Sequence, residues 1–423
     1  MSSLADAIDR IPAAGRIVAG AYCGGPTSLL HEVAQRSSGR DWLLCTGLLL
    51  DDGGAYEAVG AGALRMTTWH VAGAARDLVE QGLIDYLPVR ASQVERHIAT
   101  WHPAAALVRV TPPDADGWCS LGPSAGYALT AVKSARVCIG EVDDSLPRTF
   151  GHNRIPASAF DALVPSQTPT PRYSASPPDP ISTAIARNVL SLLPNRPVLQ
   201  LGIGAVTESI ATVLAEERID RLRFVGMATD AVVELFERGL LERCRPAIES
   251  PDLMGTQRLM AFAHENSVVG VFPSSVVHSS RRLAHYDRFV SVNSAVEVDL
   301  SGQVNSEVVT GRQVAGIGGV LDFVDAAMNS VGGIHIVALA STARDGTRSR
   351  IVPRLGPNAA VTVPRAMVDV VVTEHGVARL AGKTARERAE ALTEIAAPQH
   401  RAALAAAIRH PARTPTGAFT GQA

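Results

Sequence analysis

The chain has 423 residues, of which 46% are hydrophobic and 4% aromatic, and it carries a formal net charge of -2. This composition indicates a globular protein with two or three hydrophobic cores. It argues against nucleic acid as the main partner, because phosphate backbones bind to basic surfaces and single strands stack on aromatic side chains.

The five cysteines are widely spaced and include no CxxC pair. We therefore expect buried thiols in a reducing cytoplasm, with no disulfide framework, zinc site or other metal site. The first residues, MSSLADAIDRIP, carry acidic side chains and lack a long apolar stretch, so they do not indicate a signal peptide. No apolar run is long enough to span a bilayer, which predicts a cytoplasmic protein without a membrane partner.

Strand-like and helix-like segments alternate along most of the chain. In the first part we expect strands at residues 16–22, 42–47, 105–110 and 136–142, and helices at 27–37 and 71–82. In the second part we expect strands at residues 197–201, 268–272, 289–292, 334–340, 360–363 and 369–373, and helices at 183–193 and 207–217. This alternation predicts an α/β protein whose mostly parallel sheets carry helices on both faces.

The segment VPSQTPTPRYSASPPDPIS, residues 164–182, contains six prolines and no periodicity. Proline removes backbone donors and fixes φ, so we interpret this segment as a linker. It divides the chain into a domain over residues 1–163 and a second domain over 183–410. The last residues, 411–423, are expected to form a mobile tail.

Two glycine-rich segments are candidates for ligand contact. In LQLGIGAVTESIA, Gly202 and Gly204 join a strand to a helix whose N-terminal N–H groups suit an anion or an oxyanion, although a tight turn alone also needs glycine. Thr207 breaks the GxGxxG pattern, which disfavours NAD. In TGRQVAGIGGVLDF, four glycines within nine residues indicate either a loop that lies against a ligand or a flexible surface loop. The flanking segment SVNSAVEVDLSGQVNSE, which contains Asn293, favours the loop that lies against a ligand over the flexible surface loop.

Two further segments carry possible reacting groups. In DADGWCSLGPSAGY, Ser124 or Gly122 could face a ligand, whereas Cys119 has no histidine near it in sequence and is interpreted as structural. In VVVTEHGVARLAGKT, Glu374 and His375 end a strand. They are either acid and base groups or a helix-start carboxylate beside a surface histidine, and the sequence does not choose between these two.

Together these segments resemble the acetyl-CoA hydrolase / 4-hydroxybutyrate CoA-transferase family, with IGEVDDSLPRTFG and STARDGTRSRIVP as further matches, over almost the whole length. The resemblance implies two open α/β domains of the CoA-transferase type, with the acyl-CoA site between them. It also implies acyl-CoA and a small-molecule acceptor as substrates, and a homodimer or larger assembly.

The resemblance assigns roles to particular residues. It places the CoA at the first glycine turn and the second glycine loop, which comprise Gly202, Ile203, Gly204, Ala205, Val206, Gly316, Gly318 and Gly319. It places Glu374 at the active site as an acid or base, and it makes Asn293 a contact to the thioester carbonyl or to pantetheine. The family's usual chemistry is ping-pong, in which a glutamate attacks the thioester and becomes a glutamyl-CoA thioester.

The nucleophilic glutamate is missing from this chain. Members of the family carry a His-Thr-Glu-Met stretch before an Asp-Gly-Val-Val helix, and the matching stretch lies in RFVGMATDAVVELFERGLL, which begins at Arg223. Met227 and Asp230 keep the register, so the position of the glutamate is Gly226. Glycine cannot form a covalent intermediate, and the neighbouring residues 221–228 contain no carboxylate.

The missing glutamate leaves three alternatives for the function of the protein. We expect direct attack of an acceptor or water on the bound thioester, polarised by the N–H donors of the glycine turn. Alternatively, Glu208, Glu297 or Glu374 substitutes for the missing nucleophile in a ping-pong reaction. The third alternative is a catalytically silent CoA-binding protein or partner subunit.

Overall fold

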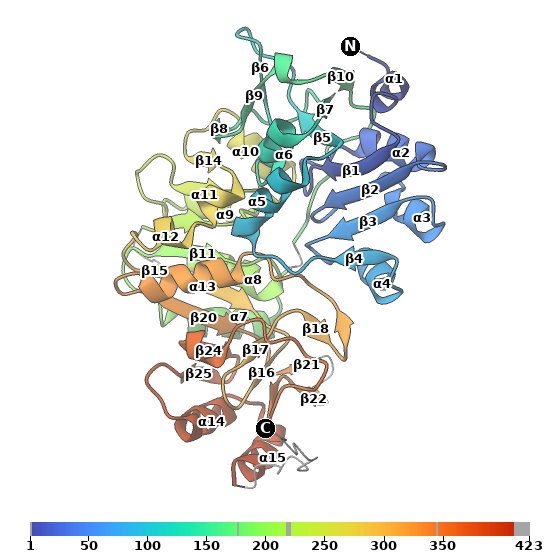
Figure 1. Cartoon of the computed structure of the whole chain (residues 1–423). Helices are drawn as coiled ribbons and strands as arrows, with labels where there is room; N and C mark the ends of the chain where they lie inside the picture. Colours follow the sequence, from blue (N-terminus) through green and yellow to red (C-terminus); the bar gives the residue numbers. More distant parts are fainter. Residues whose placement is uncertain (1, 176, 217–220, 344–345, 410–423) are drawn as a thin grey trace, which may run out of the picture.

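The computed structural model describes residues 2–175, 177–216, 221–343 and 346–409. Two large sheets dominate the molecule, and the first helix, α1 (Leu4–Ile8), and the last, α15 (Pro398–Arg409), lie at opposite ends of it (Figure 1). The first sheet has seven strands and the second has nine, and neighbouring strands are parallel except for β24 and β25. The predicted α/β class, with mostly parallel sheets and helices on both faces, is confirmed.

The first sheet is built from the N-terminal part of the chain. Its strands, in spatial order, are β10 (Ala162–Pro165), β7 (Val137–Val142), β5 (Ala105–Val110), β1 (Ala14–Ala19), β2 (Asp41–Thr46), β3 (Arg65–Thr68) and β4 (Ile84–Tyr86). Its helices are α1 (Leu4–Ile8), α2 (Thr27–Arg36), α3 (Ala55–Gly60), α4 (Ala75–Glu80), α5 (Ala91–Trp101) and α6 (Ala128–Ser134). Every residue of β5 is buried, which suits a central strand covered on both faces.

The second sheet follows the Pro-rich segment. Its strands, in spatial order, are β25 (Gly376–Arg379), β24 (Val370–Thr373), β20 (Ile334–Ala338), β15 (Phe289–Ser294), β11 (Val198–Leu201), β12 (Arg223–Val225), β13 (Ile248–Ser250), β14 (Val269–Val271) and β8 (Phe150–Gly151). Its helices are α7 (Pro180–Leu190), α8 (Ala205–Glu216), α9 (Ala231–Glu237), α10 (Gln257–Ala263), α11 (Ser274–Val277), α12 (Ser280–Leu283), α13 (Val320–Asn329), α14 (Ala385–Glu394) and α15 (Pro398–Arg409).

The remaining strands form small two- or three-stranded sheets. They are β6 (Trp118–Ser120) with β9 (Arg154–Pro156), β16 (Glu297–Asp299) with β17 (Val304–Asn305) and β23 (Ile351–Val352), β18 (Val308–Val309) with β19 (Arg312–Gln313), and β21 (Thr342–Ala343) with β22 (Arg348–Ser349). The loop that carries the second glycine cluster leaves β19 and enters α13.

The parts of the chain before and after the Pro-rich segment contact each other. Strand β8 precedes the Pro-rich segment in sequence, yet it pairs with β14 of the second sheet. Helix α5 of the first part packs against α11 of the second. The boundary at residues 164–182 stays a prediction, and the predicted tail at 411–423 lies outside the described residues.

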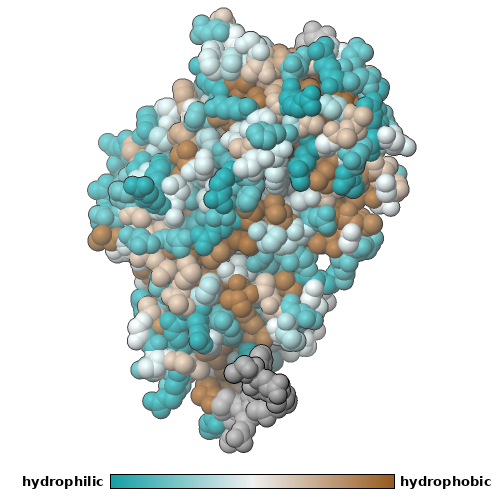
Figure 2. Space-filling model, viewed as in Figure 1, coloured by the Kyte–Doolittle hydropathy of each residue, from teal (hydrophilic) through white to brown (hydrophobic). Residues whose placement is uncertain are grey.

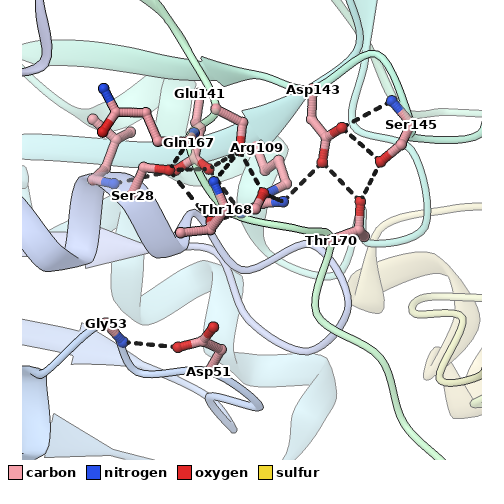
Figure 3. A network of polar contacts seen from close by, with 12 residues as sticks. Ser28, Asp51, Gly53, Arg109, Glu141, Asp143, Ser145, Gln167, Thr168 and Thr170 are labelled. Atoms are coloured by element: carbon pink, nitrogen blue, oxygen red, sulfur yellow. Dashed lines mark hydrogen bonds and ion pairs between the residues drawn. The ribbon is translucent and has the colours of Figure 1, made fainter.

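A buried ionic network anchors the first half of the Pro-rich segment to the first sheet (Figure 3). The Arg109 guanidinium lies 2.7 Å from Glu141 Oε1 and 2.8 Å from Asp143 Oδ2, and it donates to the Thr168 hydroxyl at 2.9 Å. Thr170 donates to Asp143 at 2.7 Å. Residues 168–170 are thereby tied to β5 and β7.

Two predicted elements are absent or much shorter in the structure. The strand expected at residues 360–363 is absent, and Val363 makes only an isolated bridge to Val304. The helix expected at 71–82 is shortened to α4, because Gly73 has a φ of +54°, which no α-helix accommodates. The predicted end of the helix at 207–217 lies outside the described residues.

The surface is mostly hydrophilic on the face shown in Figure 2, where hydrophobic residues form small separated patches. Across the described ranges, no helix is long and apolar enough to cross a membrane. The same ranges contain no group of three or more His, Cys, Asp or Glu side chains placed to hold a metal ion.

Candidate active site

A cavity of about 300 Å³ lies between the two parts of the chain. Side chains from both parts line it, among them Tyr22, Trp69, His70 and Tyr127 from the first and Gln200, Met227, Asp252, His278, Asn293 and Phe323 from the second. On the second sheet the cavity lies where the neighbouring strands β15, β11 and β12 end. Ligands of open α/β sheets bind at the carboxyl ends of the strands, so the cavity is the candidate active site.

Gly226 follows the last residue of β12 and lies beside this cavity. Its N–H donates to the Glu249 carbonyl at 2.9 Å, and its φ is +116°. A Cβ at this position would lie 3.2 Å from Gln200 Cγ and 3.6 Å from Phe323 Cζ, and both of these residues line the cavity. A side chain here would therefore point toward the cavity wall, and its Cβ would crowd Gln200.

Asn293 lies in the wall of the cavity and is held by two polar neighbours. Its amide nitrogen donates to Gln200 Oε1 at 3.1 Å and to the Ser291 hydroxyl at 2.8 Å, and Ser291 donates to the same Gln200 oxygen. A Cβ on Gly202 would lie 3.3 Å from Asn293 Oδ1. The Asn293 oxygen is thereby oriented toward the glycine turn.

The first glycine turn contributes Gly202 and Ile203 to the cavity wall. The Gly202 N–H donates to the Val292 carbonyl at 3.0 Å, so it is not free for a ligand. The free donors of this segment lie further along, in the first turn of α8, whose N–H groups have no intrahelical partner. Gly204, with a φ of +129°, precedes that turn, and Ala205 and Val206 begin the helix. These last three residues are not in the wall of the cavity.

The second glycine loop closes another part of the wall. Gly316 and Gly319 line the cavity, and side chains there would collide with the Trp69 carbonyl and with the His278 ring, respectively. These two glycines therefore allow the loop to lie directly against both parts of the chain. Gly318 has a φ of +56° and does not line the cavity, and its carbonyl accepts from the Ala91 N–H at 2.8 Å.

Glu374 follows β24 and lies outside the cavity wall. In the sheet order β24 is the second strand from β15, so Glu374 is displaced by roughly 10 Å from the strand of Asn293. Its carboxylate accepts from the Ser341 N–H at 2.8 Å and from the Ser341 hydroxyl at 2.6 Å. His375 Nε2 is 3.6 Å from it.

The other two candidate nucleophiles also lie away from this cavity. Glu208 accepts from the Thr229 hydroxyl at 2.9 Å and lines a small neighbouring pocket, which shares Met227 with the cavity. Burial raises the pKa of Glu208. Glu297 accepts from the Asn305 amide at 3.1 Å. Among the described residues in the cavity wall, the carboxylate that remains is Asp252.

Several titratable groups of the cavity carry no local sequence signal. Asp252 is 5% exposed, and burial raises its pKa to about 7. Burial lowers the pKa of His70 and of His278 to about 4, so both imidazoles are neutral near pH 7. Ser124, which with Gly122 is one of two alternative ligand contacts in its sequence segment, donates to Asp252 at 2.5 Å. This hydrogen bond links Asp252 to a segment that the sequence singles out.

Comparison with known proteins decides the family. A 4-hydroxybutyrate coenzyme A transferase of Clostridium kluyveri is 34% identical over 409 residues, which are 94% of this chain and 94% of that protein. The chain belongs to the acetyl-CoA hydrolase/transferase family. The sequence model of the family's C-terminal domain matches residues 255–408. The predicted resemblance is thus confirmed, and so is the prediction of an enzyme of the acyl-CoA transferase or hydrolase class.

Solved structures of other proteins share the fold of this family member over nearly its whole length. RipA of Yersinia pestis is 28% identical, with a TM-score of 0.89 and 96% of each chain covered. The 4-hydroxybutyrate CoA-transferase of Porphyromonas gingivalis is 28% identical, with a TM-score of 0.77 and 97% of each chain covered. These matches place both sheets in a fold of the CoA-transferase type.

Proposed function

We propose that this protein acts on an acyl-CoA thioester in the cavity between the two sheets, as a transferase or hydrolase whose acceptor attacks directly. The observation that carries the proposal is Gly226. It follows β12 beside the cavity, at the position that the family resemblance assigns to the nucleophilic glutamate, and it has no side chain that could form a glutamyl-CoA intermediate.

The residues around Gly226 support chemistry on a thioester. The N–H groups that open α8 suit the oxyanion that forms when a carbonyl is attacked. Asn293 is held beside that turn and could orient the same carbonyl. In the proposed step the acceptor bonds to the carbonyl carbon, the carbon–sulfur bond breaks, CoA leaves as the thiolate and the acceptor loses a proton.

The two alternatives are a ping-pong reaction through another glutamate and a catalytically silent CoA-binding protein. A ping-pong reaction through Glu208, Glu297 or Glu374 would have to bring a carboxylate into a cavity that none of them lines. A silent CoA-binding protein is favoured by the same glycine that favours direct attack. We retain it as the second candidate, because the loss of the nucleophile by itself is compatible with the loss of activity.

One experiment separates these three functions. The protein is incubated with butyryl-CoA, with and without acetate, and free CoA, the acyl product and the intact protein are followed by mass spectrometry. A protein-free incubation corrects for spontaneous hydrolysis. Direct attack predicts several equivalents of free CoA per protein and no borohydride-reducible glutamyl adduct. A reducible adduct on a glutamate indicates the substituted ping-pong route, and binding without CoA release indicates the silent protein.

Some properties of the proposed enzyme stay predictions. These are its acyl-CoA and acceptor substrates, the CoA contacts of the two glycine segments, the role of Glu374, the homodimer and the cytoplasmic location.

A further inference from the structure

The charge of the cavity restricts the acceptor. No Lys or Arg is found among the described residues of the wall, and burial keeps His70 and His278 neutral, with a pKa of about 4 for each. A carboxylic acid acceptor would enter as an anion without a cationic partner, next to the carboxyl group of Asp252. Burying an unpaired charge beside a like charge is strongly unfavourable. The cavity therefore suits a neutral acceptor.

Asp252 is held at the turn that contains Gly226. Its backbone carbonyl accepts from the Ala228 N–H at 3.3 Å and from the Ser250 hydroxyl at 2.7 Å. Its side chain reaches across to the first part of the chain, where the Ser124 hydroxyl donates to Oδ1 at 2.5 Å. The carboxyl group is thus fixed from both parts of the protein.

The second carboxyl oxygen of Asp252 is available to a ligand. Across the described residues no donor is hydrogen-bonded to Oδ2, although Asp252 is only 5% exposed and lines the cavity. The neighbouring Gly126 has no Cβ, and one built there would lie 3.1 Å from Oδ2. A carboxylate oxygen without a protein donor is an acceptor for a proton from a molecule in the cavity.

We propose that Asp252 is the general base of a hydrolytic reaction and that water is the acceptor, an inference that rests on the proposed function. Asp252 Oδ2 takes a proton from the water molecule as the water oxygen bonds to the thioester carbonyl carbon. The tetrahedral intermediate collapses, the carbon–sulfur bond breaks, and the proton on Asp252 passes to the departing CoA sulfur. The products are CoA and a carboxylic acid, and Asp252 is returned to its ionised form.

The groups around Asp252 set its pKa in a range that suits a general base. Burial raises its pKa to about 7, the hydrogen bond from Ser124 lowers the pKa, and the charge of Glu95 raises it. The phenols of Tyr22 and Tyr127 also face it, and burial raises the pKa of both, so they stay neutral. Cys23 nearby has a pKa of about 11, again raised by burial, and is neutral too. A base that titrates near the working pH is the most effective one.

The space at Gly226 complements this base. A side chain at that position would crowd Gln200 and point toward Phe323 in the cavity wall. Without that side chain, the attacking water is placed on the side of the acyl carbonyl that a glutamate would otherwise occupy. The proposed hydrolysis therefore uses two features of one turn region: the missing side chain of Gly226 and the carboxylate of Asp252, whose backbone is bonded to Ala228.

The test measures CoA release from butyryl-CoA in H2(18)O without any added acid. The wild-type protein is expected to release CoA and to place one (18)O atom in the butyrate. Asp252→Asn is expected to lower kcat by about 100-fold or more, the usual contribution of a general base. Binding of the thioether analogue of butyryl-CoA should be retained. Asp41→Asn, on the exposed start of β2, is the matched control and should keep the wild-type rate.

A pH profile separates catalysis from a structural role. The wild-type rate should rise with pH through about 7, as Asp252 loses its proton. Ser124 is a positioning residue, and Ser124→Ala removes the hydrogen bond that favours the ionised carboxylate, so the rising limb should move to higher pH. This variant keeps the inference testable if Asp252→Asn no longer binds the analogue.

The outcomes distinguish the inference from the proposed function. An unchanged rate in Asp252→Asn, or an unshifted profile in Ser124→Ala, would overturn the role of Asp252 while direct attack still stood. CoA release that requires added acetate would overturn water as the acceptor. If the wild-type protein releases no CoA under any of these conditions, the proposed function itself fails.

Discussion

Arg109 and Glu141 form an ion pair with a nitrogen–oxygen distance of 2.7 Å, and both side chains are completely buried. They lie on the adjacent strands β5 and β7, where Arg109 pairs with Glu141 in the parallel ladder. Removing one partner of a buried pair leaves the other charge without compensation. We therefore expect this pair to matter more for stability than any exposed ion pair of the chain.

The first prediction concerns that pair. Arg109→Leu should lower the free energy of unfolding by about 3–5 kcal/mol, because Glu141 and Asp143 both lose their buried cation. Urea unfolding followed by circular dichroism measures the effect. Arg65→Leu is the control, since Arg65 pairs with Asp41 at the surface, where such pairs contribute about 0–1 kcal/mol. Equal losses in the two variants would contradict the assigned importance of the network.

The second prediction concerns Gly226. Gly226→Glu should restore a carboxylate to the cavity wall, and incubation with acyl-CoA should then yield a borohydride-reducible adduct on that glutamate. The wild-type peptide around Gly226 should stay unmodified. Hydrolysis of butyryl-CoA should fall, because the side chain fills the space proposed for water.

Gly226→Ala is the matched control for this variant. Both substitutions impose a side chain at a φ of +116°, which costs on the order of 1 kcal/mol or more, but only glutamate can form the adduct. A folded Gly226→Glu protein that binds CoA, forms no adduct and hydrolyses butyryl-CoA at the wild-type rate would refute the placement of Gly226 at the reacting position.

The third prediction concerns the first glycine turn. Gly204→Val should weaken CoA binding, measured by calorimetry, because a Cβ there meets no protein atom within 4 Å and would enter the space proposed for the ligand. Gly382→Val provides the control. Gly382 also has a positive φ, of +73°, and open space around its Cβ position, but it belongs to neither of the two glycine segments proposed to contact CoA. Similar CoA affinity in both variants would make Gly204 only a turn residue.

The central strands could be predicted from sequence because they are short apolar runs between turn residues. The strand expected at residues 105–110 matches β5 at both ends. Helix α5 was not predicted, and its buried face explains why. That face includes Glu95, whose carboxylate accepts from the Ser275 N–H at 2.6 Å and from the Thr130 hydroxyl at 2.7 Å. A buried carboxylate breaks the apolar periodicity that identifies a helix.

The candidate site was only partly visible in the sequence. Asn293 and Gly202 belong to motifs that the family resemblance identifies, and both lie in the cavity wall. Asp252 belongs to no such motif. Its environment depends on Ser124, which is 128 positions away and meets it only when the two parts of the chain fold together. Contacts of this kind leave no local pattern, so burial and the resulting pKa shift had to come from the structure.

The last prediction concerns pH and stability. His335 on β20 is completely buried, neither ring nitrogen has a hydrogen-bond partner among the described residues, and burial lowers its pKa to about 4. The unfolded chain binds a proton near pH 6.5 whereas the folded chain does not, so stability falls as the pH drops below 6.5. At pH 5 this one residue should lower the free energy of unfolding by about 2 kcal/mol relative to pH 7.

His335→Leu should reduce the difference in unfolding free energy between pH 7 and pH 5 by that amount, measured by urea unfolding. The exposed His152→Leu serves as the control. An unchanged difference in His335→Leu would show that His335 is not neutral in the folded protein at pH 5.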